Sequence, residues 1–411
     1  MSSILRSEMC LEVKGEGEGR TAKILSSISS DADQCKKCLQ SGGGAPIICI
    51  RGTRGIGKTY QLLELGKLLS TGQRGETLYV NLNHFYFSNH SLYHFAREFS
   101  ESGGRVLLLD QIFKYPGWAE ELITCHKDFP RLRIVFTASS VMTLEEEYPQ
   151  LKGLVEICDL YGFSFREYLN EQYGLHFPKV TLDELLSKHR EIASRVKEKL
   201  DPMDAFPRYL RRGYYPHSGD ETLFGENLVK NMNMLLEVDL VYIRQIAPTY
   251  LPKLRKLLYL VGEQHDGITN VSSLSEAIDT SRATVMNYLK YLSDARLIRM
   301  IYKEGNEYPR KPDRVFINDT NILKVMRDSD IDMSLTGKTF FLSTVQDAGI
   351  EVHLSEDAGV DFILNHSIPV RCLCKGGRRR SISPDTVNAL CTESTGGDAR
   401  DIPVWLFGFL H

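Results

Sequence analysis

The sequence of 411 residues has no excess of charge of either sign. Lysine and arginine together number 50 and aspartate and glutamate 53, so the formal net charge is −3 at pH 7. A protein that binds nucleic acid over its whole surface needs a positive field. Any contact of this chain with nucleic acid must therefore come from a local basic patch.

Long hydrophobic runs are also absent. No apolar run reaches the roughly 18 residues that a membrane-spanning helix needs, and the first seven residues lack the apolar core of a signal peptide. Hydrophobic residues make up 42% and charged residues 25% of the chain, which is typical of globular proteins. We expect a cytoplasmic protein of two or three domains with no membrane partner.

The nine cysteines do not form a recognisable zinc pattern. Cys49, Cys125 and Cys158 stand in apolar surroundings and are predicted to be small core residues. Cys35 and Cys38 are spaced like a metal or redox pair, but no second pair follows at zinc-site spacing. Their charged neighbours predict an exposed helix, with a metal or redox role as the alternative.

The most informative segment is residues 52–59, Gly-Thr-Arg-Gly-Ile-Gly-Lys-Thr, which match the phosphate-binding P-loop pattern. An apolar run at 47–50 before it predicts a buried strand, and the spacing at 60–69 predicts a helix. Backbone N–H groups of such a loop and the N-terminus of its helix bind phosphate oxygens. The segment predicts that the chain binds ATP with Mg²⁺. The predicted binding residues are Gly52, Thr53, Arg54, Gly55, Ile56, Gly57, Lys58, Thr59 and Tyr60.

Further apolar runs at 77–82, 105–110 and 133–137 alternate with helical stretches. This alternation predicts an α/β fold with a parallel sheet covered on both faces. Phosphate ligands bind at the carboxyl ends of the strands in such sheets. We expect a P-loop ATPase core at 45–165, preceded by a polar lead-in at 1–44.

Three residues near the ends of these strands are candidates for catalysis together with Lys58, which would reach the β- and γ-phosphates. Asp110 ends a strand and would bind Mg²⁺ with Thr59, as the Walker B acid does. Gln111 follows it; an amide cannot accept a proton but can orient water, which predicts slow turnover. Ser139 would contact the γ-phosphate or the attacking water, or else cap the next helix.

Together, residues 51–59, 109–118, 135–140 and 163–169 resemble the prokaryotic AAA+-like ATPases that carry a C-terminal domain of unknown function. The ending at 402–410 is similar too. Against this family, Gln111 stands in place of a glutamate and Ala138 in place of a glycine. The stretch at 150–154 has Lys152 as its only cation, where relatives carry an arginine; Arg211 or Arg212 is an alternative phosphate sensor or a solvated charge.

Beyond the ATPase core the pattern becomes helical, which predicts a helical lid at 166–262 and a winged helix at 263–320. Helices at 271–278 and 281–292, capped by Ser281, form a helix-turn-helix pattern, and 295–302 and 314–317 would be the wing strands. The second helix would face the major groove of DNA. Packing against another protein or the ATPase core is the alternative. The candidate DNA contacts are Arg282, Thr284, Asn287 and Lys290.

For the α+β domain at 321–411, the resemblance implies a restriction-nuclease-like fold. It places Asp361 as the first metal-binding acid, but Cys374 replaces the second acid, Arg380 the lysine and Lys338 an upstream glutamate. One carboxylate cannot hold a two-acid metal site, so we interpret the domain as non-catalytic. The basic run at 378–380 is a contact for nucleic acid or an acidic partner, or a solvated loop.

These observations favour an ATP-binding AAA+-like protein, a slow ATPase whose nucleotide state controls the winged helix and the C-terminal domain. The alternatives are a nucleotide-sensing scaffold that does not hydrolyse ATP, and a DNA-binding ATPase.

Overall fold

The computed structural model describes residues 11–12, 47–70, 75–216, 222–264, 267, 270–327, 333–373, 385–391 and 400–411. Of the lead-in at 1–44, the structure describes only the short strand at 11–12, so Cys35 and Cys38 lie outside the described residues. Cys374 and the basic run at 378–380 also lie outside them. The chain divides into two compact units, Met1–Tyr161 and Gly162–His411. Each unit is described by itself.

The first unit is built on a six-stranded sheet with the order β1-β3-β4-β5-β2-β6. Five neighbouring strands are parallel, and only β1 pairs in the antiparallel direction, with β3. The predicted parallel sheet is therefore confirmed. The strands are β1 (Leu11–Glu12), β2 (Ile47–Gly52), β3 (Thr77–Asn81), β4 (Val106–Asp110), β5 (Arg133–Ser139) and β6 (Val155–Asp159).

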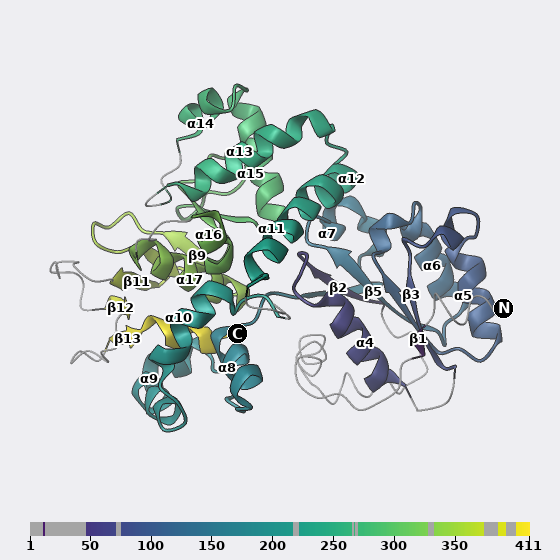
Figure 1. The fold of residues 1–411 in the computed structure, drawn as a ribbon, viewed down its shortest axis with the longest axis horizontal. Helices are drawn as coiled ribbons and strands as arrows, with labels where there is room; N and C mark the ends of the chain where they lie inside the picture. The colour runs from purple at the N-terminus through teal and green to yellow at the C-terminus, as the bar shows by residue number, and fades with distance from the viewer. Residues whose placement is uncertain are drawn as a thin grey trace. The chain divides into compact units, whose positions relative to one another are not determined.

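Helices cover both faces of this sheet. Figure 1 shows α4 (Lys58–Leu69) on one side and α5 (Leu92–Glu101) and α6 (Trp118–Asp128) on the other; the short α7 (Leu144–Glu147) follows β5. All five residues of β4 are buried, as expected for a parallel strand between two helical layers. Cys49, Cys125 and Cys158 are buried too, which confirms them as core residues.

The second unit begins with helices and ends with a mixed sheet. Thr181 and Glu184 form a capping box at the start of α9, and Ser164 and Glu167 do so for α8, which satisfies the first N–H groups of both helices. The helices before the sheet are α8 (Phe165–Tyr173), α9 (Leu182–Lys197), α10 (Pro202–Arg212), α11 (Phe224–Met234), a π-helical turn (Leu235–Leu240), α12 (Val241–Arg244), α13 (Leu251–Gly262), α14 (Val271–Ala277) and α15 (Arg282–Asp294).

The predicted helix-turn-helix elements and hairpin are present. Helices α14 and α15 are followed by β7 (Ile298–Ile301) and β8 (Arg314–Ile317), which pair in the antiparallel direction. The side chain of Ser281 accepts a hydrogen bond from the N–H of Thr284 over 3.1 Å, which confirms the predicted cap. Ala277, the last residue of α14, is half-buried. Ile278 is the buried residue beside it, because α14 ends at Ala277 and the chain turns there.

The C-terminal part of the second unit is α+β, as predicted. Its five strands have the order β13-β12-β11-β10-β9, with β9, β10 and β11 antiparallel and β11, β12 and β13 parallel. The elements are α16 (Thr320–Met326), α17 (Met333–Asp347), β9 (Val352–Leu354), β10 (Phe362–Leu364), β11 (Ile368–Leu373), β12 (Val387–Leu390) and β13 (Asp401–Pro403).

A buried 3-10 helix, Val404–Phe409, joins the beginning of this unit to its end. The ring of Phe165 in α8 lies 6.3 Å from that of Trp405 and 6.4 Å from that of Phe409. Arg166 donates hydrogen bonds of 3.0 and 2.9 Å to the backbone oxygen of His411. The two aromatic segments that the sequence placed far apart thus form one core. None of the described helices is both long and apolar enough to cross a membrane.

Candidate functional site

The P-loop lies between β2 and α4, at the carboxyl edge of the parallel strands. Strand β2 ends at Gly52 and α4 begins at Lys58. Gly55 and Gly57 have φ angles of 83° and 89°, a left-handed backbone that glycine adopts at little cost. Because the turn ends at the first residue of α4, the first N–H groups of the helix point toward the space in front of the loop. That arrangement is suited to binding an anion.

Lys58 lies across the inside of this loop. Its Nζ donates a hydrogen bond of 2.7 Å to the backbone oxygen of Thr53. Thr53 and Ile56 are buried, whereas Thr59 and Tyr60 are exposed at the start of α4. The lysine is therefore held at the loop by a carbonyl, a weaker partner than a phosphate oxygen would be.

The carboxylate of Asp110 accepts hydrogen bonds from α4, from two neighbouring strands and from the residue that follows it. Its Oδ2 accepts from the hydroxyls of Thr59 and Tyr79, each over 2.9 Å. Its Oδ1 accepts from the hydroxyl of Thr137 and, over 3.0 Å, from the N–H of Gln111. Burial and the charge of Asp110 raise the pKa of the Tyr79 hydroxyl, so Tyr79 stays a donor. The structure thus brings Thr59 and Asp110, the two predicted metal ligands, into contact.

Gln111 has an unusual backbone. Its φ and ψ angles are 57° and 50°, in the left-handed region that non-glycine residues seldom occupy. Its N–H donates to Asp110 and to the hydroxyl of Thr137, over 2.9 Å. Strain of this kind clusters at functional sites, and it fixes the direction in which the chain leaves β4.

Two serines lie at the end of β5, next to the start of the P-loop. Ser139 pairs with Gly52 in the register of β5 and β2, and its hydroxyl accepts a long hydrogen bond, 3.5 Å, from the N–H of Val141. The N–H of Ser140 donates to the oxygen of Gly52 over 3.0 Å. Among the described residues, the Ser140 hydroxyl has no hydrogen-bond partner although it is buried. The hydroxyl in need of a partner is therefore that of Ser140, one residue beyond the predicted Ser139.

Arg51, directly before the P-loop, is engaged elsewhere. Its guanidinium binds the two carboxylate oxygens of Asp159 over 2.8 Å each, and Glu145 over 2.8 Å. Burial alone would lower the pKa of Arg51, but these two acids raise it above its usual value. Arg51 thus joins β2 to β6 and α7, and a phosphate would have to compete with two carboxylates for it.

The sequence does not single out Tyr79, and it marks Thr137 only as one of several hydroxyl residues at a strand end, without a contact to Asp110. Thr137 stands at a strand end beside candidate hydroxyls, which was a usable signal. Tyr79 lies inside β3, two residues before its end, and nothing in the local sequence marks it. Its role depends on the pairing of β3 with β4, which places Asn81 opposite Asp110.

In the second unit, three of the four candidate DNA contacts on α15 have partners. Thr284 shares a hydrogen bond with Ser281, 2.9 Å between hydroxyls. Asn287 accepts from the hydroxyl of Tyr308 over 3.2 Å, and Lys290 donates to Asp294 over 2.6 Å. Arg282 is exposed. Of these contacts, only that of Asn287 with Tyr308 comes from the hairpin loop, whereas the other two lie within α15 and its cap.

The acid of the proposed nuclease-like site is neutralised by a lysine. Nζ of Lys338 lies 3.0 Å from Oδ1 of Asp361, and Oδ2 accepts from the N–H of Cys372 over 2.8 Å. An ammonium group in this place supplies the positive charge that a metal ion would bring.

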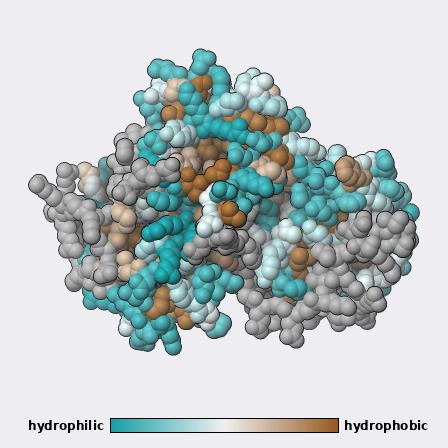
Figure 2. Space-filling model, viewed as in Figure 1, coloured by the Kyte–Doolittle hydropathy of each residue, from teal (hydrophilic) through white to brown (hydrophobic). Residues whose placement is uncertain are grey.

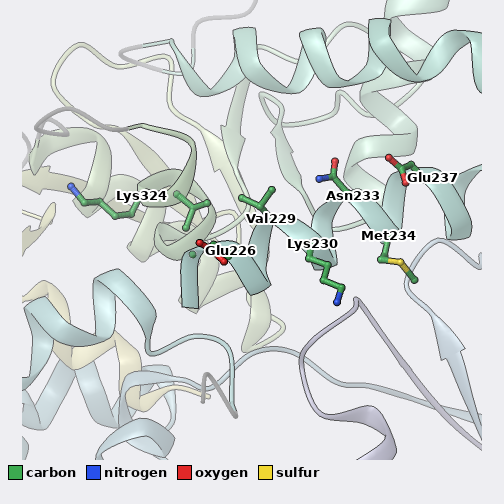
Figure 3. A pocket seen from close by; sticks show the side chains of 9 residues that line it. Glu226, Val229, Lys230, Asn233, Met234, Glu237 and Lys324 are labelled. Carbon is green, nitrogen blue, oxygen red and sulfur yellow. The ribbon is translucent and has the colours of Figure 1, made fainter. Parts of the chain in front are cut away.

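A groove of about 730 Å³ runs along α11 and reaches α16 (Figure 3). Val229 and Met234 are exposed in it, with Glu226, Lys230 and Lys324 around them. Figure 2 shows hydrophobic atoms gathered over the same helices. The lining holds no histidine, cysteine or paired acids in a catalytic arrangement, so the groove is not a candidate active site.

Comparison with known proteins agrees with the P-loop site. Residues 44–169 match the AAA domain family, and residues 203–331 match a domain of unknown function (DUF8612). The chain is 25% identical over 276 residues to an uncharacterized protein of Methanocaldococcus jannaschii, a match that covers 63% of this chain and 57% of that protein. This chain therefore spans little more than half of that relative.

Similarity to solved structures is low. PCH-2 of C. elegans is 12% identical with a TM-score of 0.24, covering 67% of this chain and 66% of that one. The Hsp104–ADP complex of S. cerevisiae is 13% identical with a TM-score of 0.28, covering 64% and 48%. TM-scores this low do not establish a shared fold. The family match and the P-loop geometry together support an AAA-type, nucleotide-binding domain in the first unit.

Proposed function

We propose that the first unit binds ATP with Mg²⁺ and hydrolyses it slowly. The contact between Thr59 and Asp110 beside the P-loop is the observation that supports this most directly. Loop N–H groups and Lys58 would bind the β- and γ-phosphates, because they are the positive groups at the loop. In this role Lys58 leaves the carbonyl of Thr53 for a phosphate oxygen.

The spacing of the two oxygens suits magnesium. Neighbouring ligands of an octahedral Mg²⁺ lie about 2.9 Å apart, because each metal–oxygen bond measures about 2.0–2.1 Å. The Thr59 hydroxyl and Oδ2 of Asp110 are 2.9 Å apart. Tyr79 and Thr137 hold the carboxylate in place, so binding requires little rearrangement of Asp110. A bound Mg²⁺ would neutralise charge that develops on the phosphates.

We expect slow turnover because of the side chain at Gln111 and because of the acids that pair with Arg51. The amide of Gln111 can orient a water molecule but cannot accept its proton. Arg51 is paired with two acids and so is not available to stabilise the transition state. The same observations favour the second candidate, a nucleotide-sensing scaffold that binds ATP without hydrolysing it.

In the second unit, we propose that α13–α15 with the β7–β8 hairpin form a winged helix whose position responds to the nucleotide. The contact of Asn287 with Tyr308 of the hairpin loop favours packing within the unit over DNA binding as its use. The division into lid, winged helix and degenerate nuclease-like domain remains a prediction.

ATP binding and steady-state phosphate release, measured with Mg²⁺ for the native chain and for Lys58→Ala, test the proposal. We expect turnover to fall at least about 100-fold in Lys58→Ala, since it loses the group that stabilises the phosphates. Lys127→Ala, an exposed lysine on α6, is the matched control. Tight binding with equal turnover in native and Lys58→Ala protein would favour the scaffold, and no ATP binding by the native chain would refute both.

A further inference from the structure

The second unit brings together two histidines and a glutamate that the nucleotide site does not use. Glu351 precedes β9, His353 lies within it, and His366 is in the turn between β10 and β11. Nε2 of His353 is 2.9 Å from Oε1 of Glu351, and Nε2 of His366 is 2.8 Å from Oε2 of the same carboxylate. The three ligand atoms lie within 4.8 Å of one another.

The backbone explains why these residues meet. Residues 351 and 353 are two apart in an extended segment, so their side chains share a face. The antiparallel pairing of β9 with β10 brings the chain back to Glu351. The backbone oxygen of Glu351 accepts a hydrogen bond from the N–H of Asn365 over 3.0 Å. Asn365 and His366 have φ angles of 44° and 61° in a tight hairpin turn whose second place usually holds glycine. His366 occupies it instead, and its ring centroid lies 5.0 Å from that of His353.

A second carboxylate orients His366. Nδ1 of His366 is 2.9 Å from Oε1 of Glu304, in the loop after β7. If Nδ1–H donates to Glu304, the Nε2 lone pair faces an oxygen of Glu351 at 2.8 Å. Two acceptors approach this closely only with a positive charge between them, either a second proton or a metal ion. His366 thus lies between two carboxylates, those of Glu304 and Glu351, which supply the negative charge that a bound cation would meet.

We propose that Glu351, His353 and His366 bind one divalent transition-metal ion of the zinc class. Two imidazole nitrogens and a carboxylate oxygen are ligands that Zn²⁺ or Co²⁺ prefers, whereas Mg²⁺ and Ca²⁺ prefer oxygen alone. Glu304 supplies the carboxylate behind a ligating histidine that is usual in metal sites. The side chains of Glu351 and His366 are 54% and 52% exposed, so an ion can enter and a water molecule can complete the site.

The metal ion would fasten the loop after β7 to the edge of the C-terminal sheet. Strand β9 is the last strand of that sheet, and the N–H of Leu354 already donates to the oxygen of Tyr302 over 2.8 Å. Lys303 pairs with Glu356 over 2.8 Å on the same edge. Metal binding would strengthen a third link, the contact of His366 with Glu304, and would raise the melting temperature of the second unit.

The test uses the full chain, free of nucleotide and dialysed against chelator, with Cys35→Ser and Cys38→Ser substitutions that remove a competing thiolate pair. Cobalt titration followed by absorption reports both stoichiometry and ligand type. We expect saturable binding of one Co²⁺ per chain, displaced by Zn²⁺, with ligand-field bands and no thiolate charge-transfer band. Mg²⁺ should not displace it. Absence of saturable binding overturns the proposal.

Substitutions at His366, His353 and Glu304 test whether these residues hold the metal ion. His366→Asn keeps a side chain that tolerates the left-handed backbone and should weaken cobalt binding at least about tenfold, as should His353→Gln. Glu304→Gln should weaken it about 10- to 100-fold. His176→Ala, an exposed histidine of the same unit, is the control and should bind as the parent does. If His366→Asn binds cobalt as tightly as the parent does, the metal binds elsewhere and the assignment is refuted.

Discussion

The hydroxyl of Thr59 and the carboxylate of Asp110 lie 2.9 Å apart, although 51 positions separate them in the chain. Thr59 is in the first turn of α4, and Asp110 ends β4, which is separated from β2 by β5. The helix and the strand therefore meet in front of the sheet edge, where the P-loop opens. This contact connects the phosphate-binding loop to the acid that the proposed Mg²⁺ site needs.

Asp110→Asn should weaken Mg²⁺-dependent ATP binding, whereas Tyr79→Phe should largely preserve it. The first change deletes the charge; the second deletes one of four hydrogen bonds to the same carboxylate. We expect the apparent Mg²⁺ affinity in the presence of ATP to fall at least about tenfold in Asp110→Asn. Tyr79→Phe should mainly lower the free energy of unfolding, by about 1 kcal/mol. Equal loss of Mg²⁺ affinity in both variants would mean that Asp110 acts only as part of a hydrogen-bond network.

Gln111→Glu should raise the rate of ATP hydrolysis. A carboxylate at this place can accept a proton from water, and positioned bases of this kind contribute about 100-fold or more. Single-turnover phosphate release separates this chemical step from product release. Gln111→Ala serves as the control and should turn over no faster than the native chain. If Glu and Ala behave alike, residue 111 does not face the attacking water.

Asp319 should make the stability of the second unit depend on pH. It is buried at the start of α16, and burial raises its pKa to about 6, above its usual value of about 3.9. The folded state therefore holds the proton more tightly than the unfolded state, so stability should fall as pH rises from about 4 to about 6 and then level off. The expected loss is about 3 kcal/mol.

Asp319→Asn tests this dependence, since asparagine keeps an oxygen for the N–H groups of Asn321 and Ile322 but does not ionise. Urea unfolding at several pH values should show the slope in the native chain and its loss in the variant. Asp183→Asn, at an exposed position of α9, should keep the native slope. Parallel pH profiles for native and Asp319→Asn protein would contradict the role of Asp319.

DNA affinity should not depend on α15. Asn287 and Lys290 are held by Tyr308 and Asp294, so we expect Arg282→Ala and Lys290→Ala to leave DNA affinity unchanged across a salt titration. A DNA-binding helix would behave differently. Each lost phosphate contact would make the slope of log affinity against log salt concentration shallower by about 0.9. A drop in affinity with such a change in slope, in either variant, would establish the DNA-binding ATPase instead.

The sequence alone determined the P-loop pattern, the order of strands and helices around it, and the place of Asp110 at a strand end, because glycine patterns, apolar runs and strand ends are local signals. The helix-turn-helix elements and their Ser281 cap were visible for the same reason.

Only the tertiary structure decided which distant residues meet. Tyr79 reaches Asp110 because β3 and β4 are paired in one register, and Arg51 is occupied because β2 lies beside β6. Phe165 packs on Trp405, and His366 returns to Glu351 through a hairpin turn. These contacts depend on strand order, register and chain reversal, which the periodicity of a single segment does not encode.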